Sequence, residues 1–147
     1  MTLAEQLRRD EGVRLHPYQD TEDVWTWGVG HNLSQPLCHD VVELLCQGEL
    51  DAACALCLGE DIANVRGQLV DILPWYLALS DARRGVLENM AFNLGVQGLL
   101  GFRRMLAHTL DGAWEDAATA MLDSRWARQV GARAVRLADQ MRTDVWQ

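Results

Sequence analysis

Hydrophobic residues recur at helical spacing over most of the chain and at alternating spacing only near its start. Residues 2–11 carry leucines four positions apart behind a threonine that suits a helix N-cap, and Gly12 follows as a stop signal. Residues 13–33 follow the two-residue period of strands, and an acidic turn at residues 20–23 divides them. This pattern predicts a short helix followed by a small antiparallel sheet.

Helical spacing dominates after Pro36. The longest apolar-periodic stretch begins at Leu50 and ends at about Leu73, just before Pro74. A helix of this length would span about 35 Å at 1.5 Å per residue. Shorter helices are expected on both sides of it, over residues 38–47, 81–94, 99–109, 113–122 and 132–141.

These elements predict a single α+β domain, residues 1–147, with two lobes. A sheet lobe would cover about residues 12–50, and a connecting helix about 50–73. A larger helical lobe would consist of residues 74–147 together with residues 1–11. Two lobes joined by one long helix leave a cleft between them.

Composition and charge narrow the function classes. The 147 residues carry a formal net charge of −8, and the first 60 residues hold the whole excess of acidic side chains. Such a chain is not typical of a nucleic-acid binder that relies on a general positive field. No stretch approaches the eighteen or so apolar residues of a membrane helix, and the amino end lacks the apolar core of a secretory signal. We therefore expect a cytoplasmic protein that does not insert into a membrane.

Four cysteines lie close together in the sequence, at positions Cys38, Cys46, Cys54 and Cys57. Spacings of eight, eight and three return to nearly the same helix face, which favours buried free thiols that pack as small hydrophobic groups. Two alternatives stay open. One is a zinc site built from Cys54, Cys57 and His39, although a second Cys-x-x-Cys pair is absent; the other is a redox-sensitive pair.

Three residues near the start of the chain could carry chemistry together. Glu11 ends the first predicted helix, where the helix dipole disfavours an ionised carboxylate and so suits a general acid. Asp20 begins the turn, and Thr26 lies in the following strand. Taken singly, each has an ordinary explanation: a solvated glutamate, an aspartate that caps its own turn, and a threonine with high strand propensity.

Taken together, the three residues suit glycoside hydrolysis. The helix end, the turn and the strand follow one another in the chain, so two carboxylates and a hydroxyl can face one cleft. One acid would protonate the leaving oxygen, while the other carboxylate would handle a water on the opposite face of the sugar ring.

The same segment resembles a known family. Residues 7–15, 18–22 and 26–31 closely resemble the T-even-phage-type lysozymes, glycoside hydrolase family 24, whose motif is a Glu, eight residues, an Asp, five residues and a Thr. The similarity continues through segments 81–84, 89–92, 101–102, 124–126 and 142–146. It implies N-acetylmuramidase activity on the β-1,4 bond between N-acetylmuramic acid and N-acetylglucosamine in peptidoglycan.

The resemblance also implies roles for individual residues. Glu11 would be the proton donor, and Asp20 with Thr26 would handle the attacking water. A water held between these two side chains predicts an inverting reaction. His31 is similar to the family histidine that pairs with an acid on the long helix, here one of the residues 60–61 (Glu60 or Asp61).

Two arginines and several substrate positions complete the comparison. Arg133 is similar to the family arginine that approaches the catalytic glutamate, and Arg125 could meet an acid across the cleft; a plain surface guanidinium is the alternative for both. The positions matched to substrate contacts are Glu22, Asn32, Phe92, Met105 and Ala120. Among them Asn32 stands where the family can have a leucine, and Met105 and Ala120 stand at the Ser and Asn positions, so the sugar and peptide subsites differ. Glu22 is also the acid expected to meet Arg125.

The implied enzyme is a monomer that acts on peptidoglycan glycan strands without a metal or a cofactor, for lysis of a host bacterium. A separate pore protein of the holin type would release it. The rival hypotheses are an inactive relative that binds peptidoglycan or a protein, and a transglycosylase or chitinase-like activity. A sugar-binding module through Trp25 and Trp27 is weaker, since two tryptophans on one strand face more often belong to the core.

Overall fold

The computed structural model describes residues 1–147, which form two compact units. One unit consists of residues 4–64, and the other of residues 65–147 together with residues 1–3. The boundary falls inside the long helix α3 (Leu50–Ile72), which begins in the first unit and ends in the second. Most of the first helix is grouped with the sheet, whereas the sequence analysis places residues 1–11 with the helical lobe.

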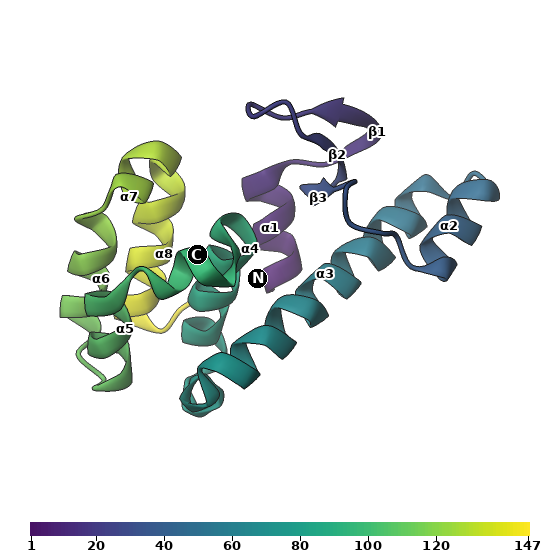
Figure 1. The fold of residues 1–147 in the computed structure, drawn as a ribbon. Coiled ribbons are helices and arrows are strands. Elements are labelled where there is room, and N and C mark those ends of the chain that lie inside the picture. Colours follow the sequence, from purple (N-terminus) through teal and green to yellow (C-terminus); the bar gives the residue numbers. More distant parts are fainter. The chain divides into compact units, whose positions relative to one another are not determined.

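The first unit contains a three-stranded antiparallel sheet that follows the first helix (Figure 1). Its elements before α3 are α1 (Leu3–Glu11), β1 (Arg14–Gln19), β2 (Trp25–Gly28), β3 (His31–Asn32) and α2 (His39–Cys46). Gly12 ends α1 with a φ of +76°, a left-handed conformation that glycine adopts without steric cost. The predicted α+β class, with one small antiparallel sheet, is confirmed.

Thr26 occupies the middle of this sheet. It pairs with Tyr18 of β1 on one side and with Asn32 of β3 on the other. The ladder between β1 and β2 is irregular before Tyr18, and there the indole Nε1 of Trp27 donates a hydrogen bond of 2.9 Å to the Leu15 carbonyl. The buried Trp27 side chain therefore holds β1 and β2 together where backbone pairing fails.

The two tryptophans of β2 do not form the predicted core pair. Trp27 is 3% exposed, but Trp25 is 55% exposed. Residues 26–29 are all buried, although consecutive side chains of a strand point to opposite faces. Burial therefore depends on how far along the chain a residue lies, and not on which face of the sheet it occupies. Trp25 lies next to the acidic turn, at the open end of the strand, and the prediction that it packs in the core is wrong.

The second unit is helical. After α3 it contains a 3₁₀ helix (Pro74–Ala78), α4 (Asp81–Leu100), α5 (Arg103–Leu110), α6 (Trp114–Leu122), α7 (Arg125–Val130) and α8 (Ala132–Thr143). Gly95 interrupts α4 with a φ of +74° and a ψ of 158°, so the predicted end at Leu94 marks a kink. Neither α7 nor the 3₁₀ helix is predicted from the sequence. No helix of the chain is both long enough and apolar enough to cross a membrane.

Large apolar side chains from several helices of this unit form its core. The fully buried ones include Leu87, Met90, Leu99, Met121 and Leu137. Burying a side chain of this size stabilises a protein by about 1.5–3 kcal/mol, so this cluster is the main source of stability in residues 65–147.

The cysteines divide into two pairs, although all four are free thiols. Cys54 and Cys57 are buried on α3, and burial raises the pKa of the Cys54 thiol, as expected for an inert packing group. Cys38 precedes α2 and Cys46 ends it, and both are exposed, so the prediction of four buried thiols is wrong for these two. The eight-residue spacing from Cys46 to Cys54 does not run along one helix, because the chain turns at Gly48 between α2 and α3.

Candidate active site

Glu11 lies at the last position of α1, where the chain turns towards the sheet. Its carboxylate packs against the turn between β2 and β3: a methyl group built on Gly30 would lie 3.4 Å from Glu11 Oε2. Gly30 has a φ of +68°, which favours glycine. The turn therefore brings bare backbone against the glutamate, and no side chain intervenes.

Asp20 caps its own turn, as its position predicts. Its Oδ1 accepts hydrogen bonds from the backbone N–H groups of Glu22, at 2.8 Å, and Val24, at 2.9 Å. Both of these bonds go to the same oxygen, so Oδ2 has no hydrogen bond within the chain. The turn thus fixes the carboxylate while leaving one oxygen available.

A backbone carbonyl joins Thr26 to Asp20. The carbonyl of Val24 accepts a 2.9 Å hydrogen bond from Thr26 Oγ1–H and a 3.0 Å bond from the backbone N–H of Asp20. Thr26 is 5% exposed, so its hydroxyl is held in one orientation. The hydroxyl proton is engaged, and the lone pairs of Oγ1 are left to accept a further hydrogen bond. Nothing in the sequence identifies Val24 as the residue that connects the two.

The register of the sheet places Thr26 near the residues that contact the two carboxylates. Thr26 lies two residues after Val24, which is bonded to Asp20, and it pairs with Asn32, two residues after Gly30. Two residues of a strand span about 7 Å. The first unit therefore brings the three predicted catalytic side chains to one region of the sheet.

His31 is held on β3 by an acid of α3. Its Nδ1 lies 2.8 Å from Asp61 Oδ2 and 3.0 Å from Oδ1, which decides between the two acids considered from the sequence. The hydrogen bond to Asp61 and a smaller contribution from Cys57 raise the pKa of His31 to about 10, although burial opposes this shift. The ion pair fastens the sheet to the long helix within the first unit.

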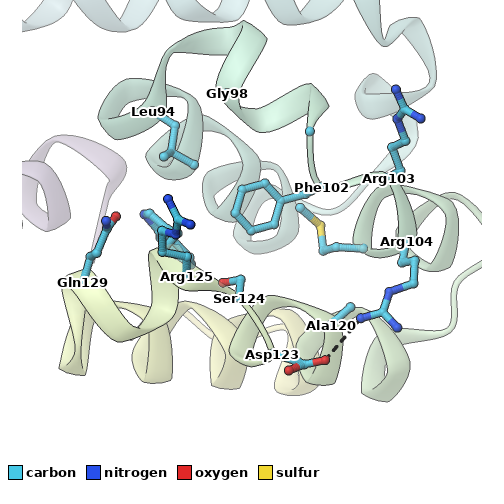
Figure 2. A pocket seen from close by; sticks show the side chains of 13 residues that line it. Leu94, Gly98, Phe102, Arg103, Arg104, Ala120, Asp123, Ser124, Arg125 and Gln129 are labelled. Carbon is cyan, nitrogen blue, oxygen red and sulfur yellow. Dashed lines mark hydrogen bonds and ion pairs between the residues drawn. The ribbon is translucent and has the colours of Figure 1, made fainter.

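The second unit contains a cavity of about 480 Å³ with an apolar floor and a charged rim (Figure 2). Phe102 and Trp126 meet edge to face on this floor, with ring centroids 5.8 Å apart. Two of the positions matched to substrate contacts, Met105 and Ala120, line the cavity, and Arg125 lies on its rim. Met105 is 1% exposed and belongs to the helical core.

Comparison with known proteins adds to this geometry. Residues 8–142 match the sequence profile of a family described as phage lysozyme. The chain belongs to the phage lysozyme family. It is 36% identical to the pre-baseplate central spike protein Gp5 of Enterobacteria phage T4, in a match that covers 93% of this chain and 27% of that protein. It is 26% and 24% identical to two Dictyostelium discoideum proteins named probable T4-type lysozymes 1 and 2, over 97% of this chain and 94% of each relative.

Membership of the phage lysozyme family and the two T4-type lysozyme relatives support a lysozyme-like function of the glycoside hydrolase class. The roles of the individual catalytic and substrate-binding positions stay predictions.

The remaining predicted site residues of the chain have defined surroundings within their own units. Arg133 is 6% exposed, and its Nε donates a 2.9 Å hydrogen bond to Asn89 Oδ1. Asn32 is exposed, and its Oδ1 accepts from Ser34 N–H at 2.9 Å. Phe92 is half-buried on α4. The expected approach of Arg133 to Glu11 and the pairing of Arg125 with Glu22 stay predictions.

Sequence reasoning missed a buried polar network in the second unit. Glu88 is 3% exposed, and its carboxylate accepts two 3.1 Å hydrogen bonds from Arg66 and one of 2.6 Å from Tyr76. Burial, together with the hydrogen bond to Glu88, raises the pKa of Tyr76. Every partner is satisfied, so the network has a structural role. Glu88 occupies an ordinary helical position, and no local signal marks it.

Gly30→Ala tests the packing of Glu11 against the turn. The new methyl group would contact Glu11 Oε2, and alanine is strained at a φ of +68°. We expect a loss of about 1–2 kcal/mol in the free energy of unfolding and at least a tenfold loss of lytic rate. Urea unfolding and the clearing of a cell-wall suspension measure the two effects.

Gly48→Ala is the matched control. Gly48 has a φ of +77° and nothing within 4 Å of its built methyl group, so alanine there should cause similar strain without touching Glu11. Equal losses of lytic rate in the two variants would contradict a specific role for the turn glycine.

Proposed function

We propose that this member of the phage lysozyme family is a muramidase that hydrolyses the β-1,4 bond between N-acetylmuramic acid and N-acetylglucosamine in bacterial peptidoglycan. The observation that carries the proposal is the Val24 carbonyl, which accepts hydrogen bonds from both Asp20 N–H and Thr26 Oγ1–H. This shared acceptor holds a carboxylate and a hydroxyl next to each other, and Glu11 supplies the second carboxyl group beside Gly30. These are the groups that hydrolysis of a glycoside uses.

Glu11 is the general acid of the proposed reaction. Its proton passes to the glycosidic oxygen as the bond between that oxygen and C1 breaks, so the departing sugar leaves as a neutral alcohol. Proton transfer of this kind typically accelerates a reaction by about 10²–10⁴-fold.

Asp20 and Thr26 position the attacking water. Because the proton of Thr26 Oγ1 is donated to the Val24 carbonyl, this oxygen accepts one hydrogen of the water. Asp20 Oδ2 accepts the other hydrogen and takes that proton as the new bond to C1 forms. Glu11 loses one proton and Asp20 gains one, and exchange with solvent restores both. Attack on the face opposite the leaving group inverts a β-linkage to an α-anomer.

The proposed substrate is the glycan strand of peptidoglycan, and the proposed role is lysis of a host bacterium by a monomeric enzyme. Family membership and the two T4-type lysozyme relatives support the lysozyme-like function on which this role rests. Sugar contacts are proposed at four positions taken from the resemblance, Glu22, Asn32, Phe92 and Ala120. Met105, the fifth, is 1% exposed, so its proposed role is to shape the cavity that it lines.

The products of purified peptidoglycan test the proposal. Mass spectrometry should find fragments that end in a reducing N-acetylmuramic acid, one water heavier than the anhydro sugar that a transglycosylase leaves. Proton NMR in the first minutes of turnover should show the new end as the α-anomer, before mutarotation mixes the two forms.

Each alternative product contradicts a distinct part of the proposal. An initial β-anomer would make Asp20 a nucleophile in a retaining reaction. Anhydro ends would identify a transglycosylase, and cleavage of chitin oligosaccharides alone a chitinase-like enzyme. No product from a folded, purified protein would indicate an inactive relative.

A further inference from the structure

A cluster of nitrogen, sulfur and oxygen donors lies between the sheet and α3 in the first unit, and it contains none of the three catalytic residues. His31 on β3, Cys57 and Asp61 each offer one ligand atom, and these atoms lie within 4.8 Å of one another. Cys57 and Asp61 are four residues apart on α3, so both side chains project from one face of the helix. The ion pair between His31 and Asp61 explains why these two side chains lie together. It does not explain the presence of the Cys57 thiol beside them.

A small cavity adjoins the cluster. Its volume is about 180 Å³, and its lining includes His31, Cys57, Asp61 and Cys38. Cys38 is the residue before α2, and its side chain makes no capping hydrogen bond to the helix. Cys38 is exposed and does not belong to the three-residue cluster, but it lines the same cavity. The cavity therefore has room for a cation, with a second thiol at its edge.

We propose that His31, Cys57 and Asp61 bind one Zn²⁺ ion, with Cys38 as the fourth ligand. Imidazole, thiolate and carboxylate are the zinc ligands of proteins, at about 2.0–2.3 Å from the metal. A thiolate is a poor ligand for Mg²⁺ or Ca²⁺, which take oxygen donors. This ligand set differs from the one suggested by the sequence, which pairs Cys54 with Cys57 and adds His39, and it departs from the expectation that the chain binds no metal.

Two distances within the three-residue cluster are close to those of a tetrahedral site. Zinc–ligand bonds of about 2.0–2.3 Å place neighbouring ligand atoms about 3.3–3.7 Å apart. His31 Nδ1 lies 2.8 Å from Asp61 Oδ2, and Cys57 Sγ lies 4.0 Å from the same oxygen. To fit a tetrahedral site, the His31–Asp61 distance must increase and the Cys57–Asp61 distance must decrease, each by about half an ångström. Small side-chain rotations allow both changes.

A backbone carbonyl near His31 supports zinc binding through Nδ1 of the imidazole ring. Its Nε2 lies 3.4 Å from the Gln35 carbonyl. Metal-binding histidines almost always donate their second ring N–H to such an acceptor, which leaves the other nitrogen for the metal. On binding, Nδ1 exchanges its contact with Asp61 for the ion, and His31 and the two thiols each release a proton to solvent.

Titration of the metal-free protein with Co²⁺ tests the site directly. The protein is purified with EDTA, kept reduced, and freed of chelator before the titration. We expect one equivalent of Co²⁺ to give the visible bands of a tetrahedral site and a thiolate-to-cobalt charge-transfer band, and Zn²⁺ to displace both. Zn²⁺ should also raise the melting temperature of the wild-type protein.

Cysteine variants assign the ligands. Cys57→Ser should weaken Zn²⁺ binding at least tenfold and reduce the charge-transfer band, and Cys38→Ser should reduce this band by about half. Cys54→Ala is the matched control, because Cys54 is also buried on α3 but faces Gly28, whose built methyl group would lie 3.3 Å from its Sγ. Its binding should equal that of the wild type.

Several results would overturn the proposal. A wild-type protein without a charge-transfer band has no thiolate ligand, whatever the stability of the variants. The exposed residues His39, Asp40 and Glu43 form a second cluster of possible ligands. Binding that survives Cys57→Ser and is lost in His39→Asn would assign the metal to that surface cluster instead. An unchanged band in Cys38→Ser would remove Cys38 from the site.

Discussion

Replacing Glu11 by glutamine should abolish cell-wall clearing while the protein stays folded. Glutamine has nearly the same shape but carries no acidic proton for the leaving oxygen, so the expected loss of rate is about 10²–10⁴-fold. Stability should be unchanged or slightly higher, because a carboxylate at a helix C-terminus costs about 0.3–1 kcal/mol. The rate is measured as the fall in turbidity of a peptidoglycan suspension, and folding by circular dichroism and thermal unfolding.

Glu49→Gln is the matched control for this substitution. Glu49 is exposed in the turn before α3, so the same chemical change there removes one negative charge without touching the catalytic region. Its rate should stay within about twofold of the wild type, as is usual for a surface substitution. A Glu11→Gln variant that retains more than about a tenth of the wild-type rate would contradict the proton-donor role.

Local signals in the sequence were enough to predict most of the fold. Gly12 and Gly48 end helices in left-handed conformations, Pro74 follows α3, and Gly95 breaks α4 where the apolar period stops. Each of these residues acts through its own backbone geometry, which does not depend on tertiary contacts. For this reason the helix ends could be predicted from single positions.

Burial could not be predicted in the same way. Trp25 and Trp27 are two residues apart on one strand, so the alternation places them on the same face, yet only Trp27 is buried. Cys38 and Cys46 share an apparent helical spacing with the two buried thiols but lie at the two ends of a separate short helix. Whether a side chain is covered depends on which other elements lie over it, and periodicity carries no information about that.

The candidate site was partly predictable from the sequence. The spacing of Glu11, Asp20 and Thr26 identifies the acids and the hydroxyl, because the resemblance to a lysozyme motif specifies them by position. The groups that orient them, the Val24 carbonyl and the bare backbone of Gly30, act through main-chain atoms. Any residue type supplies a carbonyl, so sequence patterns cannot identify such a contact.

Replacing Asp61 by asparagine should cause a large loss of stability in the first unit. His31 is 7% exposed, and breaking a buried ion pair by removing one partner costs about 3–5 kcal/mol. Because the Asp61 side chain is 25% exposed, we expect a loss near the lower limit, about 3 kcal/mol, at pH 6. Urea unfolding in the presence of EDTA measures it, so that no metal ion replaces the ion pair.

The loss should shrink as the pH rises. The pKa of His31 is about 10 in the folded protein and 6.5 in the unfolded chain, so the folded state holds the imidazole proton more tightly. The stabilisation is therefore complete below about pH 6.5 and disappears as the pH passes through 10. The wild type and Asp61→Asn should differ most at pH 6 and least at pH 10.5.

Asp123→Asn, which breaks the exposed ion pair with Arg104, should cost less than about 1 kcal/mol at every pH. A difference between wild type and Asp61→Asn that does not change from pH 6 to pH 10.5 would mean that Asp61 stabilises the protein by packing or neutral hydrogen bonding, and not through the charge of His31.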